Sequence, residues 1–283
     1  MNCFRVGTAG WSYEDWRGIV YPKREPRGFD RLGLMSALFD ANEINSTFYR
    51  IPDARQTADW ARRVAGNPRF RFTAKLFRGF THERTAGASD AAAFRDAMAP
   101  IDEAGRLGAV LVQYPFSFHD TAEYRAGLAR TLDLFEAIPL AVEFRHASWD
   151  NQETEKLLAE REVAWANIDQ PRLPGNLGAT DRVTAPFAYY RFHGRNAEKW
   201  FGGTSNVERY DYLYVEEELD PWISRIREGA RRAATKGVYV ILNNHFRGQA
   251  VTNALMMQKA LTGDSRAVPE TLLETYPQLS AVA

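Results

Sequence analysis

Short apolar segments alternate with longer amphipathic ones along this chain, and the alternation limits how it can fold. A parallel strand is buried on both faces and is almost wholly apolar, whereas a surface helix repeats apolar residues every three or four positions. The predicted strands are CFRVG (3–7), NEIN (42–45), FRFTAK (70–75), RLGAVLVQ (106–113), PLAVEFR (139–145), VAWANID (163–169), AYYRFHG (188–194) and VYVILNN (238–244). The predicted helices are 31–40, 53–64, 90–104, 121–138, 150–162, 215–236 and 248–261.

Eight strands that alternate with helices predict a TIM-type (β/α)₈ parallel barrel. One connection differs, because residues 170–186 carry too many Pro and Gly residues for a helix and predict an irregular segment between strands six and seven. An open doubly wound sheet is the alternative, but the chain has no G-x-G-x-x-G turn, which favours closure. We expect one domain over residues 1–283, with a core of about 4–261 and a C-terminal extension at 262–283.

The composition narrows the class of protein. The chain has 36 basic and 36 acidic residues, so net charge does not indicate nucleic acid as a partner, although a local basic pocket remains compatible with it. Cys3 is the only cysteine, so we expect no disulfide and no cysteine-ligated cluster. No long uncharged apolar run and no signal-peptide pattern occur, which predicts no membrane partner and a cytoplasmic location. The sequence carries no signal for the oligomeric state.

Polar residues gather at the carboxyl ends of the predicted strands, where TIM barrels place their active sites. Side chains two positions apart share a face of a strand, so each polar pair is expected to point into the barrel, with Phe144, Ile168 and Phe192 toward the helices. These polar residues are Glu43 and Asn45, Lys75, Gln113, Glu143 and Arg145, Asn167 and Asp169, Arg191 and His193, and Asn243.

Acidic residues and one histidine are the catalytic candidates. Strands five, six and seven are neighbours in a barrel, so Glu143, Asp169 and His193 are expected to meet, with Glu43 as a reserve carboxylate. Such a group can transfer protons, and it can equally hold a divalent metal through oxygen and imidazole ligands. No ligand motif such as H-E-x-x-H favours the metal.

Cations at the same end predict an anionic substrate. Lys75, Arg145 and Arg191 reach the mouth, and Arg binds carboxylate or phosphate through two parallel hydrogen bonds. The alternative is that these cations only neutralise the acidic residues. A structural ion-pair network of this size would be a costly way to fill a barrel.

Further substrate-binding candidates come from the strand ends and the loops. Asn45, Gln113 and Asn243 supply amides, Tyr49 and Trp11 supply rings that could stack on a base or a sugar, and His82 follows the third strand. The loop aromatics could equally pack together as a lid. His245 has the parity of Asn243 and is a reserve acid or base.

Several motifs together resemble the YecE-like family, known as domain of unknown function 72. They are GTAGWSYEDW, EINSTFYRIP, FTAK followed by FTHE, LVQYPFSF, EFRHASW, YYRFHGR and VYVILNNH, and the resemblance spans residues 4–261. The resemblance implies a TIM-barrel-like fold. The activity of the family is not established, so it assigns no catalytic roles to these residues.

The sequence therefore predicts an enzyme that acts on a small or oligomeric anionic substrate by acid–base hydrolysis or elimination. Glu143 and His193 are the expected proton-transfer groups, and Lys75, Arg145 and Arg191 orient the anion. One alternative is a metal-dependent phosphodiesterase or nuclease that uses Glu143, Asp169 and His193 as ligands. Another is a non-catalytic protein that binds a nucleotide or metabolite. G-x-S-x-G is absent, which argues against serine hydrolase chemistry.

Overall fold

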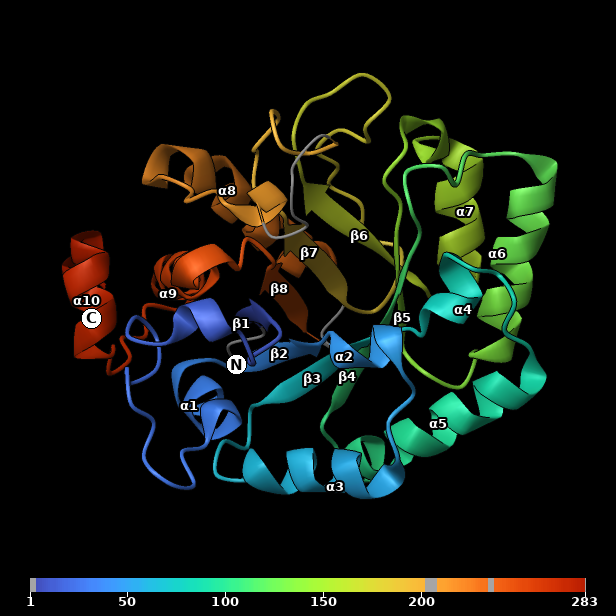
Figure 1. Cartoon of the computed structure of the whole chain (residues 1–283). Helices are drawn as coiled ribbons and strands as arrows, with labels where there is room; N and C mark the ends of the chain where they lie inside the picture. Colours follow the sequence, from blue (N-terminus) through green and yellow to red (C-terminus); the bar gives the residue numbers. More distant parts are fainter. Residues whose placement is uncertain (1–3, 202–207, 234–236, 283) are drawn as a thin grey trace.

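The computed structural model describes residues 4–201, 208–233 and 237–282, and its eight parallel strands close into one barrel (Figure 1). Each strand pairs with the next along the chain, and β8 pairs with β1. The predicted fold is confirmed, and the open sheet is excluded. The strands are β1 (Phe4–Ala9), β2 (Ala41–Ile44), β3 (Arg71–Lys75), β4 (Leu107–Gln113), β5 (Leu140–Glu143), β6 (Ala164–Asp169), β7 (Ala188–Phe192) and β8 (Val238–Leu242).

Helices surround the barrel, and polar side chains fix where several of them begin. Asp30, Asp53, Thr121 and Asn151 each accept a hydrogen bond from a backbone N–H in the first turn of the helix that follows. The helices are α1 (Arg31–Leu38), α2 (Ser46–Tyr49), α3 (Ala54–Arg63), α4 (Arg78–Thr81), α5 (Ala88–Glu103), α6 (Ala122–Leu134), α7 (Gln152–Glu160), α8 (Glu216–Arg232), α9 (Gln249–Thr262) and α10 (Glu270–Thr275). Five short 3₁₀ turns are η1 (Glu14–Trp16), η2 (Ala147–Trp149), η3 (Glu208–Tyr210), η4 (Phe246–Gly248) and η5 (Pro277–Ala281).

All the long helices predicted from the sequence are present. The end of the predicted helix 215–236, at residues 234–236, lies outside the described residues, as does Cys3 of the first predicted strand. Residues 170–187 contain no helix, as predicted. This segment is tied to β6 by Thr184, whose hydroxyl donates to the carbonyl of Val163 at 2.6 Å and accepts from the N–H of Trp165 at 2.8 Å.

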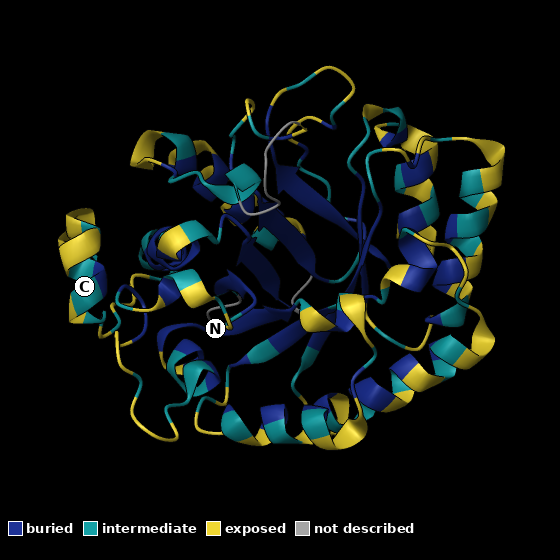
Figure 2. Cartoon of the chain, in the orientation of Figure 1, coloured by how far each residue is buried: buried dark blue, intermediate teal, exposed yellow. Residues whose placement is uncertain are grey.

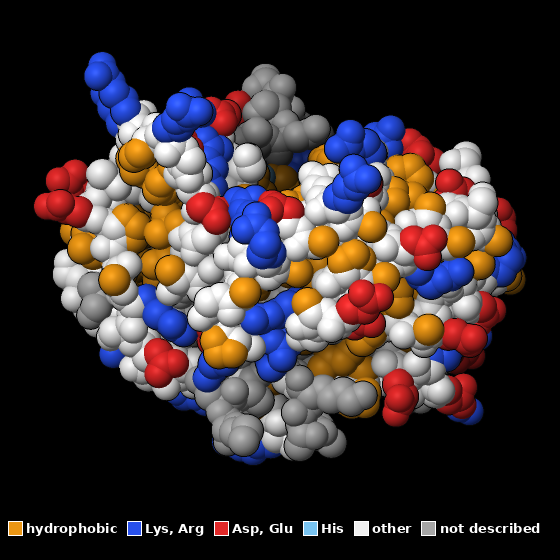
Figure 3. Space-filling model, turned by 90° about the horizontal axis from the view of Figure 1, so that it is seen from below, with side chains coloured by type: hydrophobic (Ala, Val, Ile, Leu, Met, Phe, Trp, Pro, Cys, Tyr) orange, Lys and Arg blue, Asp and Glu red, His pale blue; other side chains and the backbone are white. Residues whose placement is uncertain are grey.

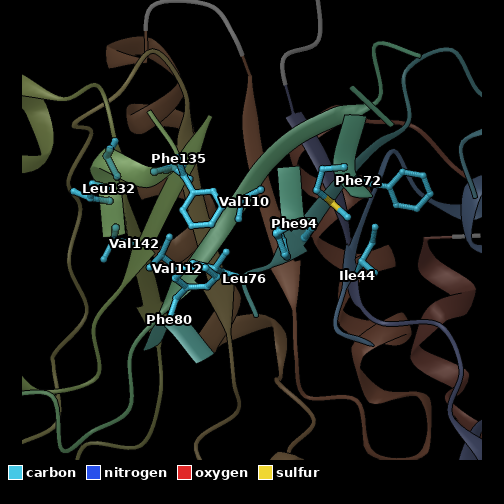
Figure 4. Close-up of a cluster of buried hydrophobic side chains, with 14 of the residues drawn as sticks. Ile44, Phe72, Leu76, Phe80, Phe94, Val110, Val112, Leu132, Phe135 and Val142 are labelled. Atoms are coloured by element: carbon cyan, nitrogen blue, oxygen red, sulfur yellow. The ribbon is translucent and has the colours of Figure 1, made fainter. Parts of the chain in front are cut away.

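The apolar core lies mainly between the strands and the helices. Figure 4 shows part of it, where Phe72, Val110 and Val142 of the barrel lie near Phe94 and Phe135 of the surrounding layer. Figure 2 shows buried strands at the centre and exposed residues along the outer sides of the helices. This outer layer fixes the strands and leaves their carboxyl ends open for a site.

Small side chains line much of the barrel interior and leave room for a few large ones. Five alanines at inward positions of β2, β4, β5 and β6 pack with Tyr189 and Tyr239 in one cluster. Among the described glycines, Gly7 has the least space for a side chain, because an added Cβ would lie 1.8 Å from the carbonyl oxygen of Ala41. The alanines are Ala41, Ala109, Ala141, Ala164 and Ala166.

The C-terminal segment, expected as an extension at 262–283, adds buried side chains to the apolar layer around the barrel. Leu272 and Leu279 are fully buried in the same cluster as residues of α9. The hydroxyl of Thr271 donates to the carbonyl of Ile19 at 2.7 Å. The apolar core therefore continues beyond residue 261.

Figure 3 shows basic and acidic side chains mixed over the face seen from below. Within the described residues, no helix is both long enough and apolar enough to cross a bilayer.

Candidate functional site

An ion-pair cluster lies inside the barrel near the carboxyl ends of the strands. Arg191 of β7 contacts Glu43 of β2 through two hydrogen bonds, Nη2 to Oε1 at 2.6 Å and Nε to Oε2 at 3.0 Å. Its third nitrogen, Nη1, donates to Oε2 of Glu143 of β5 at 3.0 Å. All three side chains are almost completely buried. Arg191 therefore joins two strands that lie on different sides of the barrel.

Glu143 is held in its ionised form by two guanidinium groups. The second is that of Arg145, whose Nε lies 2.6 Å from Oε1 of Glu143. Burial alone raises the pKa of Glu143, but Arg145 and Arg191 outweigh it and hold this pKa well below its ordinary value. Because the carboxylate of Glu143 stays ionised at neutral pH, it binds the two cations and does not take up a proton at this pH.

His193 is neutral and fully buried beside Glu143. Burial, followed by the charge of Arg145, lowers the pKa of His193 to about 3. The amide nitrogen of Asn243 lies 3.0 Å from Nδ1, and Nε2 lies 3.3 Å from Oε1 of Glu143. Because an amide nitrogen donates, Nδ1 accepts and the proton of the ring sits on Nε2, on the side of the ring that faces Glu143. His193 thus packs against Glu143.

Lys75 differs from the two arginines because no carboxylate binds it. It is the last residue of β3, and its Nζ lies 3.8 Å from the centre of the Phe48 ring. Among the described residues, no side chain forms an ion pair or hydrogen bond with this amine, since Glu43 and Glu143 are engaged by Arg191 and Arg145. Burial, followed by the charge of Arg191, lowers the pKa of Lys75 to about 7.

Lys75 faces an open cavity above the ion-pair cluster. A main lobe of about 540 Å³ and a deeper lobe of about 210 Å³ share six lining residues, and together they form what we call the mouth cavity. Four cations line it, and no Asp or Glu is among its described lining residues. The cations are Lys75, Arg145, Arg191 and Arg209.

Aromatic side chains form much of the remaining wall of the mouth cavity. Phe116 contacts Phe201 edge to face, with ring centres 5.3 Å apart, and the guanidinium of Arg145 lies 5.5 Å from the ring centre of Trp200. Tyr49 and Phe201 remain strongly exposed. A ligand with an anionic end and a flat or apolar part fits such a wall.

The structure brings most of the predicted substrate-binding residues to this cavity. Lys75, Arg145, Arg191, Gln113, Tyr49, His82, Asn45 and Asn243 line one lobe or both. Trp11 lies elsewhere. Its ring packs edge to face on Trp60 of α3, with centres 5.5 Å apart, and lines a neighbouring hollow that it shares with Asn45.

The prediction that the side chain of Asp169 points into the barrel toward Glu143 and His193 is wrong, because it points outward. In the register of β6 and β7, Asp169 aligns with Phe192, which packs on Trp222 of α8, while Ile168 aligns with the inward-facing Arg191. The carboxylate of Asp169 instead accepts a hydrogen bond from Nε of Arg195 at 2.8 Å.

Asn167 shares this outward face and binds the irregular segment. Its Nδ2 donates to the carbonyl of Arg182 at 2.9 Å, and its Oδ1 accepts from the hydroxyl of Thr180 at 2.9 Å. The inward positions of β6 are Ala164 and Ala166. The polar side chains of this strand therefore form hydrogen bonds with neighbouring segments on the outside of the barrel.

The predicted metal ligands are not assembled. Asp169 lies apart from Glu143 and His193, and both oxygens of Glu143 face guanidinium groups. Across the parts of the chain that the structure describes, no group of three or more His, Cys, Asp or Glu side chains is arranged to hold a metal ion. The residues present do not fit the hypothesis of a Glu–Asp–His metal centre.

Several residues of the site were missed by sequence reasoning. The hydroxyl of Tyr189 donates to Glu43 at 3.0 Å and accepts from the hydroxyl of Thr73 at 3.0 Å, and the parity that Tyr189 shares with Arg191 could have revealed it. His245, predicted as a reserve acid or base, stacks on Tyr13 with ring centres 4.3 Å apart and lines the deeper lobe. Asn176, Arg209 and Tyr210 line the cavity from irregular segments, where no periodic signal could identify them.

Comparison with known proteins places the chain in a family. The family model described as "Protein of unknown function DUF72" matches residues 5–278. The UPF0759 protein YunF of Bacillus subtilis (strain 168) is 29% identical over 275 residues, which cover 90% of this chain and 94% of that protein.

Two solved structures of DUF72 family proteins are similar to this one. The structure from Thermotoga maritima has a TM-score of 0.80 and is 37% identical in sequence, and the match covers 91% of this chain and 98% of the Thermotoga chain. The structure from Enterococcus faecalis V583 has a TM-score of 0.80 and is 29% identical, and the match covers 93% of this chain and 97% of the Enterococcus chain. The resemblance noted in the sequence is confirmed, and the chain belongs to the DUF72 family of proteins of unknown function.

Proposed function

We propose that this protein is an enzyme that binds a small anionic substrate, with a phosphate or carboxylate group, in the mouth cavity and acts on it by acid–base hydrolysis or elimination. The observation that carries the proposal is the one-sided charge of the cavity wall. Four cations line it, whereas the carboxylates Glu43 and Glu143 lie in the buried ion-pair cluster and are absent from its described lining. Because Glu43 and Glu143 already pair with Arg191 and Arg145, an anion in the cavity would pair with the protonated amine of Lys75.

The arrangement supports a division of roles among the predicted residues. Glu43, Glu143 and His193 hold Arg145 and Arg191 in place beneath the substrate. Lys75 is the candidate acid–base group, because an amine whose pKa is about 7 exists in both protonation states at neutral pH. The sequence predicted Glu143 and His193 for proton transfer, but the two guanidinium groups on Glu143 and the complete burial of both residues favour a positioning role.

Binding is tested by thermal-shift measurements with sulfate, inorganic phosphate and pyruvate, because a ligand of the folded state raises its apparent stability. We expect these anions to raise Tm, while the uncharged glycerol and acetamide do not. Lys75→Met should reduce the shift. Lys156→Met is the matched control, since Lys156 is an exposed residue of α7. Equal shifts with charged and uncharged compounds, or none at all, would contradict the proposal.

Catalysis is tested by proton NMR on a panel of phosphorylated and carboxylated metabolites incubated with the protein. We expect at least one compound that binds to be converted by the wild type and by Lys156→Met, and to remain intact with Lys75→Met. If every bound compound is recovered unchanged, the protein is a binding protein and the enzymatic part of the proposal is wrong.

A further inference from the structure

Lys75 is the one charged strand residue of the mouth cavity to which the described part of the chain gives no anionic partner. A buried or half-buried lysine that serves the fold normally pairs with a carboxylate. Two carboxylates are close enough to influence Lys75, but Glu43 is bound by Arg191 at 2.6 Å and Glu143 by Arg145 at 2.6 Å. Both glutamates are therefore paired with arginines, and the amine of Lys75 faces the cavity without a carboxylate partner among the described residues.

The surroundings of Lys75 favour its neutral, nucleophilic form. Half-burial against Phe48 removes water from the amine, and two guanidinium groups, those of Arg145 and Arg191, disfavour a third positive charge nearby. Desolvation and a neighbouring cation are the two means by which proteins activate a lysine as a nucleophile toward carbonyl carbon. Arginine cannot take this role, because its guanidinium stays protonated.

We propose that the amine of Lys75 forms a Schiff base with the carbonyl group of an anionic aldehyde or ketone, such as an oxo acid or a phosphorylated sugar fragment, bound in the mouth cavity. This proposal rests on the proposed function, because the cations that bind the anionic group place the carbonyl at the amine. Arg145 lines both lobes beside Lys75 and is held by Glu143 and Gln170, so its guanidinium is positioned before a ligand arrives.

The chemistry balances without a further reactant. The lone pair of Nζ attacks the carbonyl carbon, and the π electrons of the C=O bond move to oxygen, which takes up the proton released by nitrogen. The carbinolamine then takes up a proton from solvent, the C–O bond breaks and water leaves, which gives a protonated imine. This iminium withdraws electrons from the adjacent carbon and so promotes loss of a proton there, and the enamine that results can expel a leaving group from the next carbon, in line with an elimination.

The test traps the imine by reduction. Full-length protein is incubated with pyruvate or dihydroxyacetone phosphate and sodium borohydride, and the intact mass and the peptide that contains Lys75 are measured. We expect one added group per chain, equal in mass to the carbonyl compound minus one oxygen atom, attached to Lys75. Lys156→Met should be labelled like the wild type.

Lys75→Arg separates this inference from the proposed function, because it keeps the positive charge and removes the nucleophile. We expect it to retain a thermal shift with sulfate and to give no adduct. If the wild type shows the sulfate shift but neither probe labels Lys75, or if exposed lysines are labelled equally, the Schiff base is wrong and the anion site stands. If sulfate also gives no shift, the proposed function fails as well.

Discussion

The guanidinium of Arg191 and the carboxylate of Glu43 form a two-point contact across the barrel interior, with nitrogen–oxygen distances of 2.6 and 3.0 Å. The two residues lie 148 positions apart in the sequence. The same guanidinium also binds Glu143. Together with Arg145, this contact balances the charge of both acids, so neither acid pairs with Lys75.

Removal of Arg191 should destabilise the fold severely. Arg191→Met leaves the buried Glu43 without the cation that binds it and leaves Glu143 with Arg145 alone, and breaking a buried ion pair from one side costs about 3–5 kcal/mol. Urea unfolding of the variant measures this loss. The control is Arg62→Met, which removes an exposed ion pair on α3 and should change the free energy of unfolding by about 0.5 kcal/mol or less. A loss below about 1 kcal/mol for Arg191→Met would contradict the role of this residue.

Gly7→Ala should also destabilise the barrel. The new Cβ would lie 1.8 Å from the carbonyl oxygen of Ala41, so β1 and β2 must separate. We expect a loss of about 1–3 kcal/mol in urea unfolding, as for overpacked cores. Gly66→Ala is the matched control, because nothing lies within 4 Å of its added Cβ. Equal stability of the two variants would show that the strands tolerate the methyl group.

His193 should make folding sensitive to acid. Its pKa is about 3 in the folded protein, against 6.5 as its ordinary value, so the unfolded chain binds more protons between these two pH values. This contribution to stability is complete above pH 6.5 and is lost as the pH falls toward 3. From pH 7 to pH 5 the wild type should lose about 2 kcal/mol more than His193→Asn. Parallel pH profiles of the two proteins would be the opposite result.

Anion affinity should weaken as Lys75 loses its proton. The charged groups that face Lys75 are Arg191, Arg145, Glu43 and Glu143, with His82 uncharged because burial lowers its pKa to about 4. The pKa of Lys75, about 7, makes its amine change charge near neutral pH. Sulfate keeps a constant charge, so its dissociation constant for the wild type should rise about tenfold from pH 6 to pH 8 in calorimetric titrations.

The matched variant for this titration is Lys75→Arg, which stays charged over the same range. Its affinity for sulfate should be nearly independent of pH. If the wild type is equally independent, the anion does not bind at Lys75.

The closed barrel was predictable because its signal is local and repeated. Most of the parallel strands are short apolar runs, such as the one around Val110, and all of them except β6 are followed by a helix. The inward direction of Glu143, Arg145, Arg191 and His193 followed from the two-residue period of a strand. The agreement between these strands and the structure shows that periodicity alone located most of the ion-pair cluster.

Asp169 was misplaced because both faces of β6 are buried and polarity alone cannot decide which one points inward. The deciding factor is space: the interior position beside Tyr189 needs a small residue, and Ala166 supplies it. Residues such as Trp200 reach the mouth cavity from irregular segments. Their positions depend on the path of a loop, which leaves no periodic trace in the sequence.

The central claim is that Lys75 faces an anion-binding cavity without a carboxylate partner. The most direct measurement is the pKa of the Lys75 side chain by NMR of protein labelled with ¹³C-lysine, with and without sulfate, assigned through Lys75→Arg. We predict a pKa of about 7 in the free protein and a higher value with sulfate, because the anion favours the charged amine. An ordinary pKa that sulfate leaves unchanged would contradict the claim.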